Sequence, residues 1–260
     1  MNKKVLFFDV DSTLYSHKSN SIPKSAIEAI KIAKENGHII VLATGRSKKL
    51  TDLLDIFKYI DFDYFVTING TLVLDKEDNL IFSLPCDKQS INKVLTLVDI
   101  YGLNLCFINK DDYYLYKDED KRSHLGYDPL HIPIPNKKEY LNEDIYQMNL
   151  FCEDEFVDEF IKLTGDKLSY SKLDNYGYDV YSKDQTKATG IKHLLEYLNI
   201  DKKDTFAFGD GHNDKEMIEF CEVGVAMGNA IEKVKKASNY ITDDIDNDGI
   251  YNAMKYFKLI

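Results

Sequence analysis

The chain has 260 residues, which is long enough for one large domain or two smaller ones. It carries 44 acidic and 33 basic residues, so its formal net charge at pH 7 is −11. Nucleic acids and anionic membranes are bound mainly through lysine and arginine, and this charge therefore argues against both kinds of partner. Hydrophobic residues make up 44% and charged residues 30%, a balance typical of a globular rather than a disordered protein.

No apolar stretch approaches the roughly 20 residues that a bilayer-spanning helix needs. Residues 1–4 lead directly into a short apolar strand. The four cysteines lie far apart and form no C-x-x-C pair, which indicates buried free thiols rather than a zinc or redox site. They are Cys86, Cys106, Cys152 and Cys221. We expect a soluble, cytoplasmic protein that is a monomer or a weak dimer.

Strands and helices alternate in the first part of the chain. Residues 5–8 and 39–43 are continuous apolar runs, which is typical of strands covered on both faces. Apolar residues at helical spacing predict one helix from residue 24 onwards and another over residues 50–57. A third strand is predicted at residues 64–66. This alternation predicts a parallel sheet with helices on both faces.

The pattern changes in the middle of the chain, beginning with a hairpin predicted over residues 71–82. Further strands are predicted at residues 103–108, 113–116, 146–151, 168–170 and 178–181, and helices around residues 91–98 and 156–161. Clustered strands with two helices predict a separate α+β domain. Residues 117–142 have the least regular pattern and are a candidate lid.

The alternation of helix and strand returns at Lys187, with strands predicted at residues 205–208 and 223–226. We therefore expect an α/β fold in which a Rossmann-like, doubly wound parallel sheet is interrupted in sequence by the α+β domain. The predicted bounds are 1–83 and 184–260 for the core domain and 84–183 for the inserted domain.

Polar residues follow the predicted strands of the core, where ligands bind in an open parallel sheet. They are Asp9, Asp11, Thr44, Gly45, Arg46, Asn69, Asp210, Asn213 and Asp214. Two carboxylates about 4 Å apart repel by roughly 4 kcal/mol at an effective dielectric constant of about 20, so four of them require a cation. Oxygen ligands without cysteine favour Mg²⁺, which commonly binds together with a substrate phosphate. The glycines of these loops would let backbone N–H groups approach that phosphate.

This set of residues could perform covalent phosphoryl transfer. A carboxylate beside a metal, a hydroxyl that holds the phosphate and a lysine from late in the chain would allow the carboxylate to act as nucleophile. A second acid would protonate the leaving oxygen and then accept a proton from water. Asp9 and Asp11 are two residues apart at a strand end, so both could reach one phosphorus atom.

Four segments resemble, in order, the motifs of the haloacid dehalogenase-like hydrolase superfamily. They are Asp9-Val10-Asp11-Ser12-Thr13, Thr44-Gly45-Arg46, Lys187-Ala188-Thr189-Gly190 and the Gly-Asp-Gly-His-Asn-Asp run at residues 209–214. The inserted α+β domain, with the motifs at residues 226–230 and 248–249, is similar to the Cof-type branch, whose inserted domain is a type IIB cap. The resemblance covers essentially the whole chain.

The resemblance implies a role for each matched position. Asp9 would be the nucleophile that forms an aspartyl-phosphate, and Asp11 the general acid and base. Thr44 would hold the transferring phosphoryl group, while Lys187 would neutralise charge. The implied Mg²⁺ ligands are Asp9, the backbone carbonyl of Asp11, Asp210 and, through water or the outer shell, Asp214. The residues implied to face the substrate are Gly45, Arg46, Asn69 and Asn213.

One position departs from the family pattern, because glycine usually follows the second acid and this chain has Ser12. If that position requires a positive φ, serine costs about 1 to 2 kcal/mol. The acid at Asp11 also separates the chain from the dehalogenating members, which lack it. No role is predicted for His17 or the other histidines, which lack metal-ligand spacing, and His212 is expected to be a loop residue near the site.

We predict a Mg²⁺-dependent phosphatase that acts on a small phosphorylated metabolite, such as a sugar phosphate or a phosphorylated cofactor. A phosphosugar mutase with the same catalytic residues is one alternative. A non-catalytic sensor of a phosphorylated metabolite is another, although paired acids around a phosphate would give a pure binder little advantage. The sequence does not identify the substrate, because the residues that select it lie in the cap.

Overall fold

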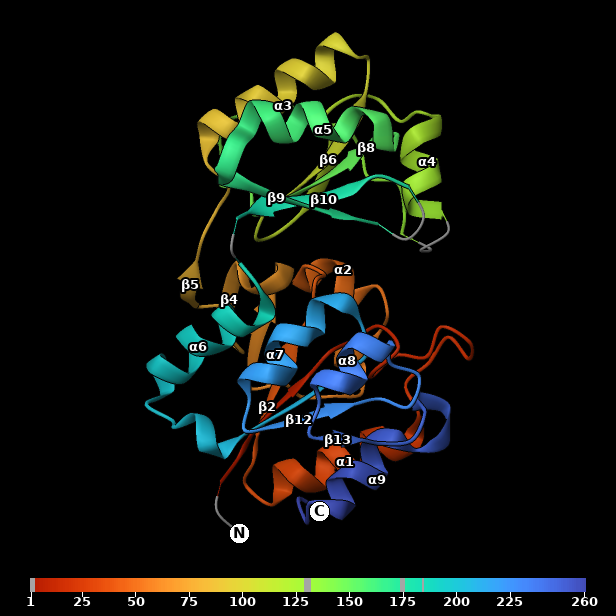
Figure 1. The fold of residues 1–260 in the computed structure, drawn as a ribbon, viewed down its shortest axis with the longest axis vertical. Helices are drawn as coiled ribbons and strands as arrows, with labels where there is room; N and C mark the ends of the chain where they lie inside the picture. Colours follow the sequence, from red (N-terminus) through yellow and green to blue (C-terminus); the bar gives the residue numbers. More distant parts are fainter. Residues whose placement is uncertain (1–2, 129–131, 174–175, 184) are drawn as a thin grey trace. The chain divides into compact units, whose positions relative to one another are not determined.

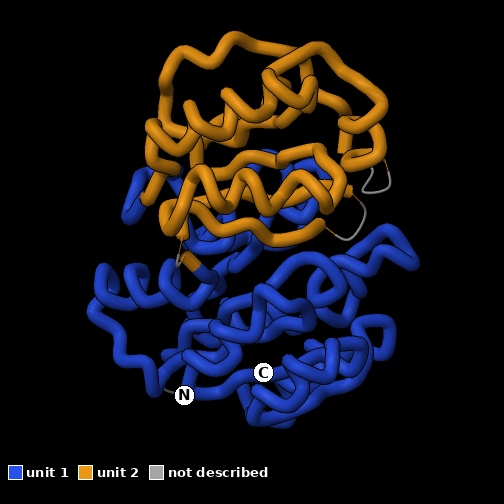
Figure 2. The backbone as a smooth tube through the Cα atoms, turned by 45° about the horizontal axis from the view of Figure 1, so that its top comes forward, with its two compact units in different colours: residues 1–83, 186–260 blue, residues 84–185 orange. Residues whose placement is uncertain are grey.

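The computed structural model describes residues 3–128, 132–173, 176–183 and 185–260. The chain forms two compact units, one of residues 1–83 with 186–260 and one of residues 84–185 (Figure 2). We call them the core unit and the cap unit. The second predicted domain junction, at residue 184, lies outside the described residues.

The described part of the core unit contains an eight-stranded sheet in the order β13-β12-β11-β1-β2-β3-β4-β5. Its parallel strands are β1 (Val5–Phe8), β2 (Ile39–Ala43), β3 (Tyr64–Thr67), β11 (Thr205–Gly209), β12 (Val223–Ala226) and β13 (Tyr240–Ile241). The antiparallel strands β4 (Leu72–Asp75) and β5 (Leu80–Ser83) form the predicted hairpin at one edge. The chain moves outward from β1 in both directions, which confirms the doubly wound fold.

Helices cover both faces of this sheet (Figure 1). They are α1 (Lys24–Glu35), α2 (Lys48–Asp52), α6 (Lys187–Leu198), α7 (Lys215–Phe220), α8 (Glu232–Ala237) and α9 (Gly249–Tyr256). Helix α1 packs against α9, and α7 packs against α6 and α8. Ala26, Ala29, Ile30 and Ala33 form the buried stripe of α1, at the spacing expected of a helix with one apolar face.

The single helix predicted over residues 50–57 is wrong. Helix α2 ends at Asp52, and a 3₁₀ turn follows at Ile56–Lys58. Asp55 lies between them with a φ of 57°, a left-handed conformation that cannot continue an α-helix. The apolar spacing did not reveal this break, because a helix and a helix with a kink bury the same face.

The cap unit has its own sheet and core. Its described residues form an antiparallel five-stranded sheet in the order β7-β6-β8-β10-β9. The strands are β6 (Asn104–Ile108), β7 (Tyr113–Leu115), β8 (Gln147–Phe151), β9 (Leu168–Lys172) and β10 (Tyr178–Ser182), and the helices are α3 (Lys88–Ile100), α4 (Lys121–Tyr127) and α5 (Asp154–Thr164). Helix α3 packs against α5, and side chains such as Val94, Phe107 and Phe160 form one buried cluster. This is the predicted α+β arrangement.

The candidate lid, residues 117–142, is more regular than its sequence pattern suggested. It contains α4, which begins with a capping box between Asp120 and Ser123. Residues 129–131 of the same segment lie outside the described residues.

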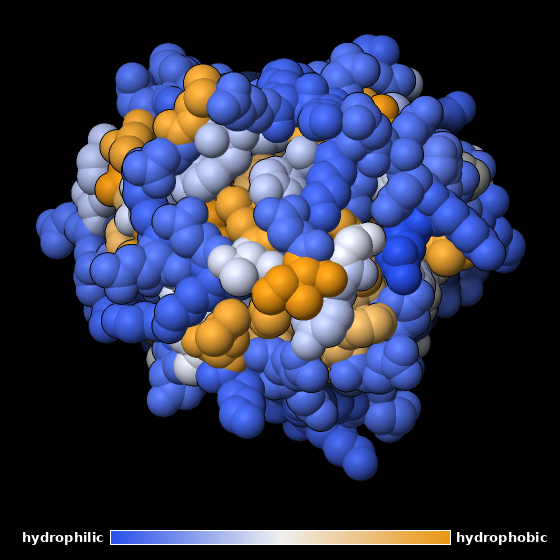
Figure 3. All heavy atoms as spheres, turned by 90° about the horizontal axis from the view of Figure 1, so that it is seen from above, coloured by the Kyte–Doolittle hydropathy of each residue, from blue (hydrophilic) through white to orange (hydrophobic). Residues whose placement is uncertain are grey.

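Hydrophilic residues cover most of the face shown in Figure 3, with apolar patches between them. Such a mixture is usual on a globular surface.

The longest described α-helix, α3, has 13 residues, well short of the roughly 20 that a membrane span requires. No described helix is therefore suited to crossing a membrane.

Candidate active site

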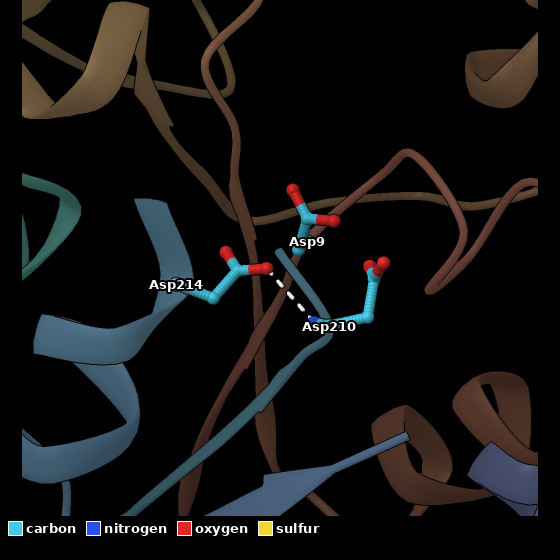
Figure 4. A group of neighbouring side chains, drawn as sticks. All are labelled: Asp9, Asp210 and Asp214. Atoms are coloured by element: carbon cyan, nitrogen blue, oxygen red, sulfur yellow. Dashed lines mark hydrogen bonds between the residues drawn. The ribbon is translucent and has the colours of Figure 1, made fainter. Parts of the chain in front are cut away.

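Carboxylates from two neighbouring strands meet at the carboxyl edge of the core sheet. Asp9 directly follows β1, and Asp210 directly follows β11, the strand paired with β1. The Asp9 N–H donates to the carbonyl of Phe208 at 3.0 Å, which extends the pairing and fixes where Asp9 lies. One oxygen each from Asp9, Asp210 and Asp214 lies within 4.8 Å of the others (Figure 4). The strand order thus brings together three of the four predicted site acids, with Asp9 about 200 residues away from the other two in sequence.

Lys187 bridges two of these acids. Its Nζ donates to Asp9 Oδ1 and to Asp214 Oδ1, both at 2.6 Å, and its side chain is completely buried. Burial alone would lower the pKa of Lys187, but the carboxylates of Asp214 and Asp9 outweigh it and hold that pKa above its ordinary value. The lysine is therefore a fixed positive charge inside the cluster.

The start of helix α6 sets the position of Lys187. Thr186 is the N-cap, and its side chain and that of Thr189 form a capping box, so Lys187 is the first helical residue. The helix start packs tightly against the loop after β3, because a Cβ on Gly70 would lie 2.1 Å from the carbonyl oxygen of Thr186. Glycine at position 70, which also has a φ of 87°, is what allows this close approach.

Without a cation, the surroundings of two acids of the cluster, Asp9 and Asp210, favour their protonated forms more than water would. Burial, together with the charge of Asp214, raises the pKa of Asp9 well above its ordinary value. Burial and Asp214 also raise the pKa of Asp210 to about 7, although the hydroxyl of Thr13 donates to Asp210 at 2.8 Å and opposes the shift. Hard oxygen donors that repel one another in this way fit a Mg²⁺ ion, which would replace the protons.

Asp214 differs from the other two acids because the protein already satisfies both of its oxygens. Its Oδ2 accepts from the N–H groups of Asp210 and Gly211 at 2.9 and 2.8 Å, and its Oδ1 accepts from Lys187. Gly209 makes room for it, since a Cβ there would lie 2.6 Å from the Asp214 side chain. Asp214 is thus placed to orient the Asp210 loop, whereas Asp9 and Asp210 are the better placed direct ligands.

Asp11 points to a different set of partners. Arg46 donates from Nε to Asp11 Oδ2 at 2.8 Å and from a terminal nitrogen to Oδ1 at 2.9 Å, and His17 Nε2 lies 2.8 Å from Oδ1. Burial alone would raise the pKa of Asp11, but the His17 hydrogen bond and the Arg46 guanidinium hold it well below its usual range. Arg46 was predicted to face the substrate and His17 was given no role; no spacing rule links either residue to Asp11.

The other predicted substrate residues gather around Gly45. Asn213 donates to Asn69 Oδ1 at 3.0 Å, and a Cβ on Gly45 would lie 3.1 and 3.2 Å from the two amide groups. Thr44 lies beside them and accepts the Arg46 N–H at 3.1 Å. Backbone and side-chain polar groups are therefore concentrated where a phosphate would be held.

The loop that carries Asn69 is strained. Ile68 and Asn69 both have a φ of 51°, and Gly70 follows with a φ of 87°. The left-handed conformation costs a β-branched residue such as isoleucine about 1 to 2 kcal/mol, and strain of this kind is concentrated at functional sites. No pattern in the sequence indicates this strain, because isoleucine rarely adopts the left-handed conformation.

Ser12 also has a positive φ, 60°, so the position that usually holds glycine does require the left-handed conformation here. Its N–H donates to the carbonyl of Tyr15 at 2.9 Å, and its carbonyl accepts from Asn229 Nδ2 at 2.8 Å. Asn229 belongs to the motif at residues 226–230, which therefore holds the turn after Asp11 in place.

Replacing Ser12 by glycine should raise the free energy of unfolding by about 0.5 to 1 kcal/mol. Glycine removes the strain of the left-handed conformation, but it also increases the conformational entropy of the unfolded chain, which offsets part of the gain. Urea denaturation at pH 7 would measure the change. Ser12→Ala is the control, because alanine keeps the Cβ and should give no gain. Equal stability of the two variants would contradict strain at this position.

Comparison with known proteins identifies the family. Residues 6–254 match the model of the haloacid dehalogenase-like hydrolases. The chain belongs to this family. It is 32% identical to YkrA of Bacillus subtilis (strain 168), a protein named provisionally as a phosphatase, over the full length of both chains. It is 25% identical to 5-amino-6-(5-phospho-D-ribitylamino)uracil phosphatase YitU of the same organism, covering 98% of each chain.

Solved structures agree with this assignment. The protein superimposes on a sugar phosphatase of haloacid dehalogenase subclass IIB with a TM-score of 0.84 and 30% sequence identity, covering 99% of this chain and 100% of the other. The resemblance to Cof-type members with a type IIB cap is thereby confirmed. So is the predicted enzyme class, a phosphoric monoester hydrolase of this superfamily.

Proposed function

We propose that the protein is a Mg²⁺-dependent phosphatase that works through a phosphorylated Asp9. The observation that carries the proposal is the environment of Asp9, which is only 6% exposed, 2.6 Å from the Lys187 ammonium group and next to Asp210. A carboxylate buried beside a fixed cation, at the carboxyl edge of an open sheet, is suited to attack a bound phosphate ester.

In the first step an oxygen of Asp9 attacks phosphorus, and the bond between phosphorus and the leaving oxygen breaks. Asp11 gives its proton to that oxygen, which departs as an alcohol. In the second step a water molecule attacks the phosphorus, Asp11 accepts the proton of that water, and the bond between Asp9 and phosphorus breaks. Inorganic phosphate leaves, and both aspartates return to their starting states.

The groups around Asp9 would stabilise the charge of the transferring phosphoryl group. Lys187 supplies one fixed positive charge, and Thr44 and Asn213 offer polar side-chain groups at the neighbouring strand ends. Asp9, Asp210 and the backbone carbonyl of Asp11 would hold Mg²⁺, with Asp214 behind them. When bound, the ion supplies further positive charge that offsets the repulsion between carboxylates and phosphate.

The low pKa of Asp11 suits its role as a base better than its role as an acid. Arg46 and His17 favour the ionised form, which is the form needed to accept a proton from water. The first step needs the protonated form. A phosphate dianion in the site raises the pKa of a nearby carboxyl through like-charge repulsion, so substrate binding itself would promote protonation of Asp11.

A small phosphorylated metabolite, either a sugar phosphate or a phosphorylated cofactor precursor, is the proposed substrate. Two relatives support this class: one is a sugar phosphatase, and the other is named for a phosphorylated ribitylamino-uracil. A panel of such compounds, compared by kcat/KM, would identify the substrate. Equal and low values for all of them would contradict the proposed class.

Phosphate release from p-nitrophenyl phosphate should require Mg²⁺ and stop when a chelator is added. Because the pKa of Asp210 is raised to about 7 without metal, protons should compete with Mg²⁺ below that pH. We expect the Mg²⁺ concentration for half-maximal activity to rise, by up to about tenfold per pH unit, as the pH falls below about 7. Full activity in the chelator would exclude the metal-dependent mechanism.

A further inference from the structure

The two oxygens of Asp11 are not equivalent. Arg46 alone would treat them alike, since it donates one hydrogen bond to each. His17 adds a second hydrogen bond to Oδ1 at 2.8 Å. An ionised carboxylate only accepts, so Nε2 of His17 carries the hydrogen in this pair. Among the described residues, Oδ1 therefore has two donors and Oδ2 has one.

A folded turn carries His17 back to Asp11. The N–H groups of Leu14 and Tyr15 donate to the carbonyl of Val10, at 2.9 and 2.8 Å, and Ser16 pairs with Ser21 across the turn. The turn is also tied to the end of the chain, because Ser16 Oγ donates to Asp246 at 2.7 Å. The position of residue 17 therefore follows from the backbone and does not depend on its side chain.

The ring of His17 is held more loosely than the guanidinium of Arg46. The His17 side chain is 44% exposed and packs edge-on against Tyr15, with ring centroids 5.3 Å apart, whereas the Arg46 side chain is 12% exposed. Arg46 thus forms the rigid part of the contact with Asp11. His17 is the part that distinguishes one oxygen from the other.

We propose that His17 is a positioning residue for the catalytic acid: it occupies Oδ1 of Asp11 and leaves Oδ2 as the oxygen that exchanges the proton. The inference rests on the proposed function, because it assumes that Asp11 protonates the leaving group. No bond to substrate is assigned to His17. Its effect is to fill a second acceptor site on Oδ1, so that Oδ2, which has only the Arg46 donor among the described residues, keeps the site for the proton.

The leaving group of the substrate provides a selective readout. p-Nitrophenolate is a stable anion and departs without a proton, whereas the alkoxide of benzyl phosphate needs the acid. Loss of His17 should therefore lower kcat/KM for benzyl phosphate by about tenfold, the effect of one hydrogen bond to a charged group, and for p-nitrophenyl phosphate by less than about twofold. A defect that is merely structural would lower both values equally.

Four variants make the test. His17→Ala should show the selective loss, and His17→Gln should recover most of it, because the glutamine amide can donate over a similar reach. His193→Ala is the matched control, a partly exposed histidine of the same unit that lies on α6 and stacks on Phe82. It should leave both substrates unaffected. Asp11→Asn is the reference for complete loss of the acid.

The results test the role of His17 separately from the acid role of Asp11. A selective loss in Asp11→Asn without one in His17→Ala would overturn the role of His17 and leave the proposed function intact. Equal losses of kcat/KM, which reports only the first step, on both substrates in Asp11→Asn would overturn the acid role itself. Equal losses in His17→Ala, or failure of His17→Gln to recover activity while its melting temperature matches the wild type, would also overturn the inference.

Discussion

Asp9→Asn should abolish phosphate release while the protein stays folded. An amide cannot form the phosphorylated intermediate, and removal of a catalytic nucleophile lowers kcat by about four orders of magnitude or more. The fold should tolerate the change, because asparagine has the same shape and removes one of the buried, mutually repelling carboxylates. The raised pKa of Asp9 means that folding disfavours its ionised form, so this penalty grows as the pH rises and is present at pH 7.

We therefore expect Asp9→Asn to melt, without metal, at a temperature equal to or above that of the wild type. Mg²⁺ should stabilise the wild type more than the variant, since the variant lacks a ligand. Asp52→Asn, on the exposed surface of α2, is the control and should keep full activity. Acid-quenched wild type should carry one phosphoryl group on the peptide containing Asp9. More than about 1% of wild-type activity in Asp9→Asn would exclude Asp9 as the nucleophile.

Lys187→Met should lower the free energy of unfolding by about 3 to 5 kcal/mol, the cost of breaking a buried ion pair on one side. It would leave Asp9 and Asp214 inside the protein without their cation. At lower pH Asp9, whose pKa is already raised, can escape the penalty by taking up a proton. The deficit, measured by urea denaturation without metal, should therefore be larger at pH 8 than at pH 5.

A double variant shows whether charge or packing causes the loss. Lys187→Met combined with Asp214→Asn removes one of the stranded charges and should recover a large part of the stability, but no activity. Lys192→Met, on the exposed face of the same helix, should change stability by less than about 0.5 kcal/mol. If the double variant were no more stable than Lys187→Met alone, the buried charges would not be the cause.

The sequence predicted the features that depend on a local pattern of apolar and polar residues. Continuous apolar runs located β1 and β2, and the polar residues after them located the site, because the ends of parallel strands meet at one edge. Apolar residues at helical spacing likewise predicted α1. By contrast, the sequence pattern did not indicate the break at Asp55 or the left-handed Ile68. Aspartate adopts this conformation only occasionally, and isoleucine adopts it rarely.

By itself, the sequence determined which strand ends carry acids, and it predicted which lysine could join them and that oxygen ligands would suit Mg²⁺. Only the tertiary structure decided which of these groups contact one another. Lys187 joins Asp9 and Asp214 through contacts between residues up to 178 positions apart. His17 reaches Asp11 through a turn whose shape depends on Asn229 and Asp246 near the other end of the chain. Local patterns encode which face of an element is buried, whereas side-chain direction and hydrogen-bond partners depend on packing between distant segments.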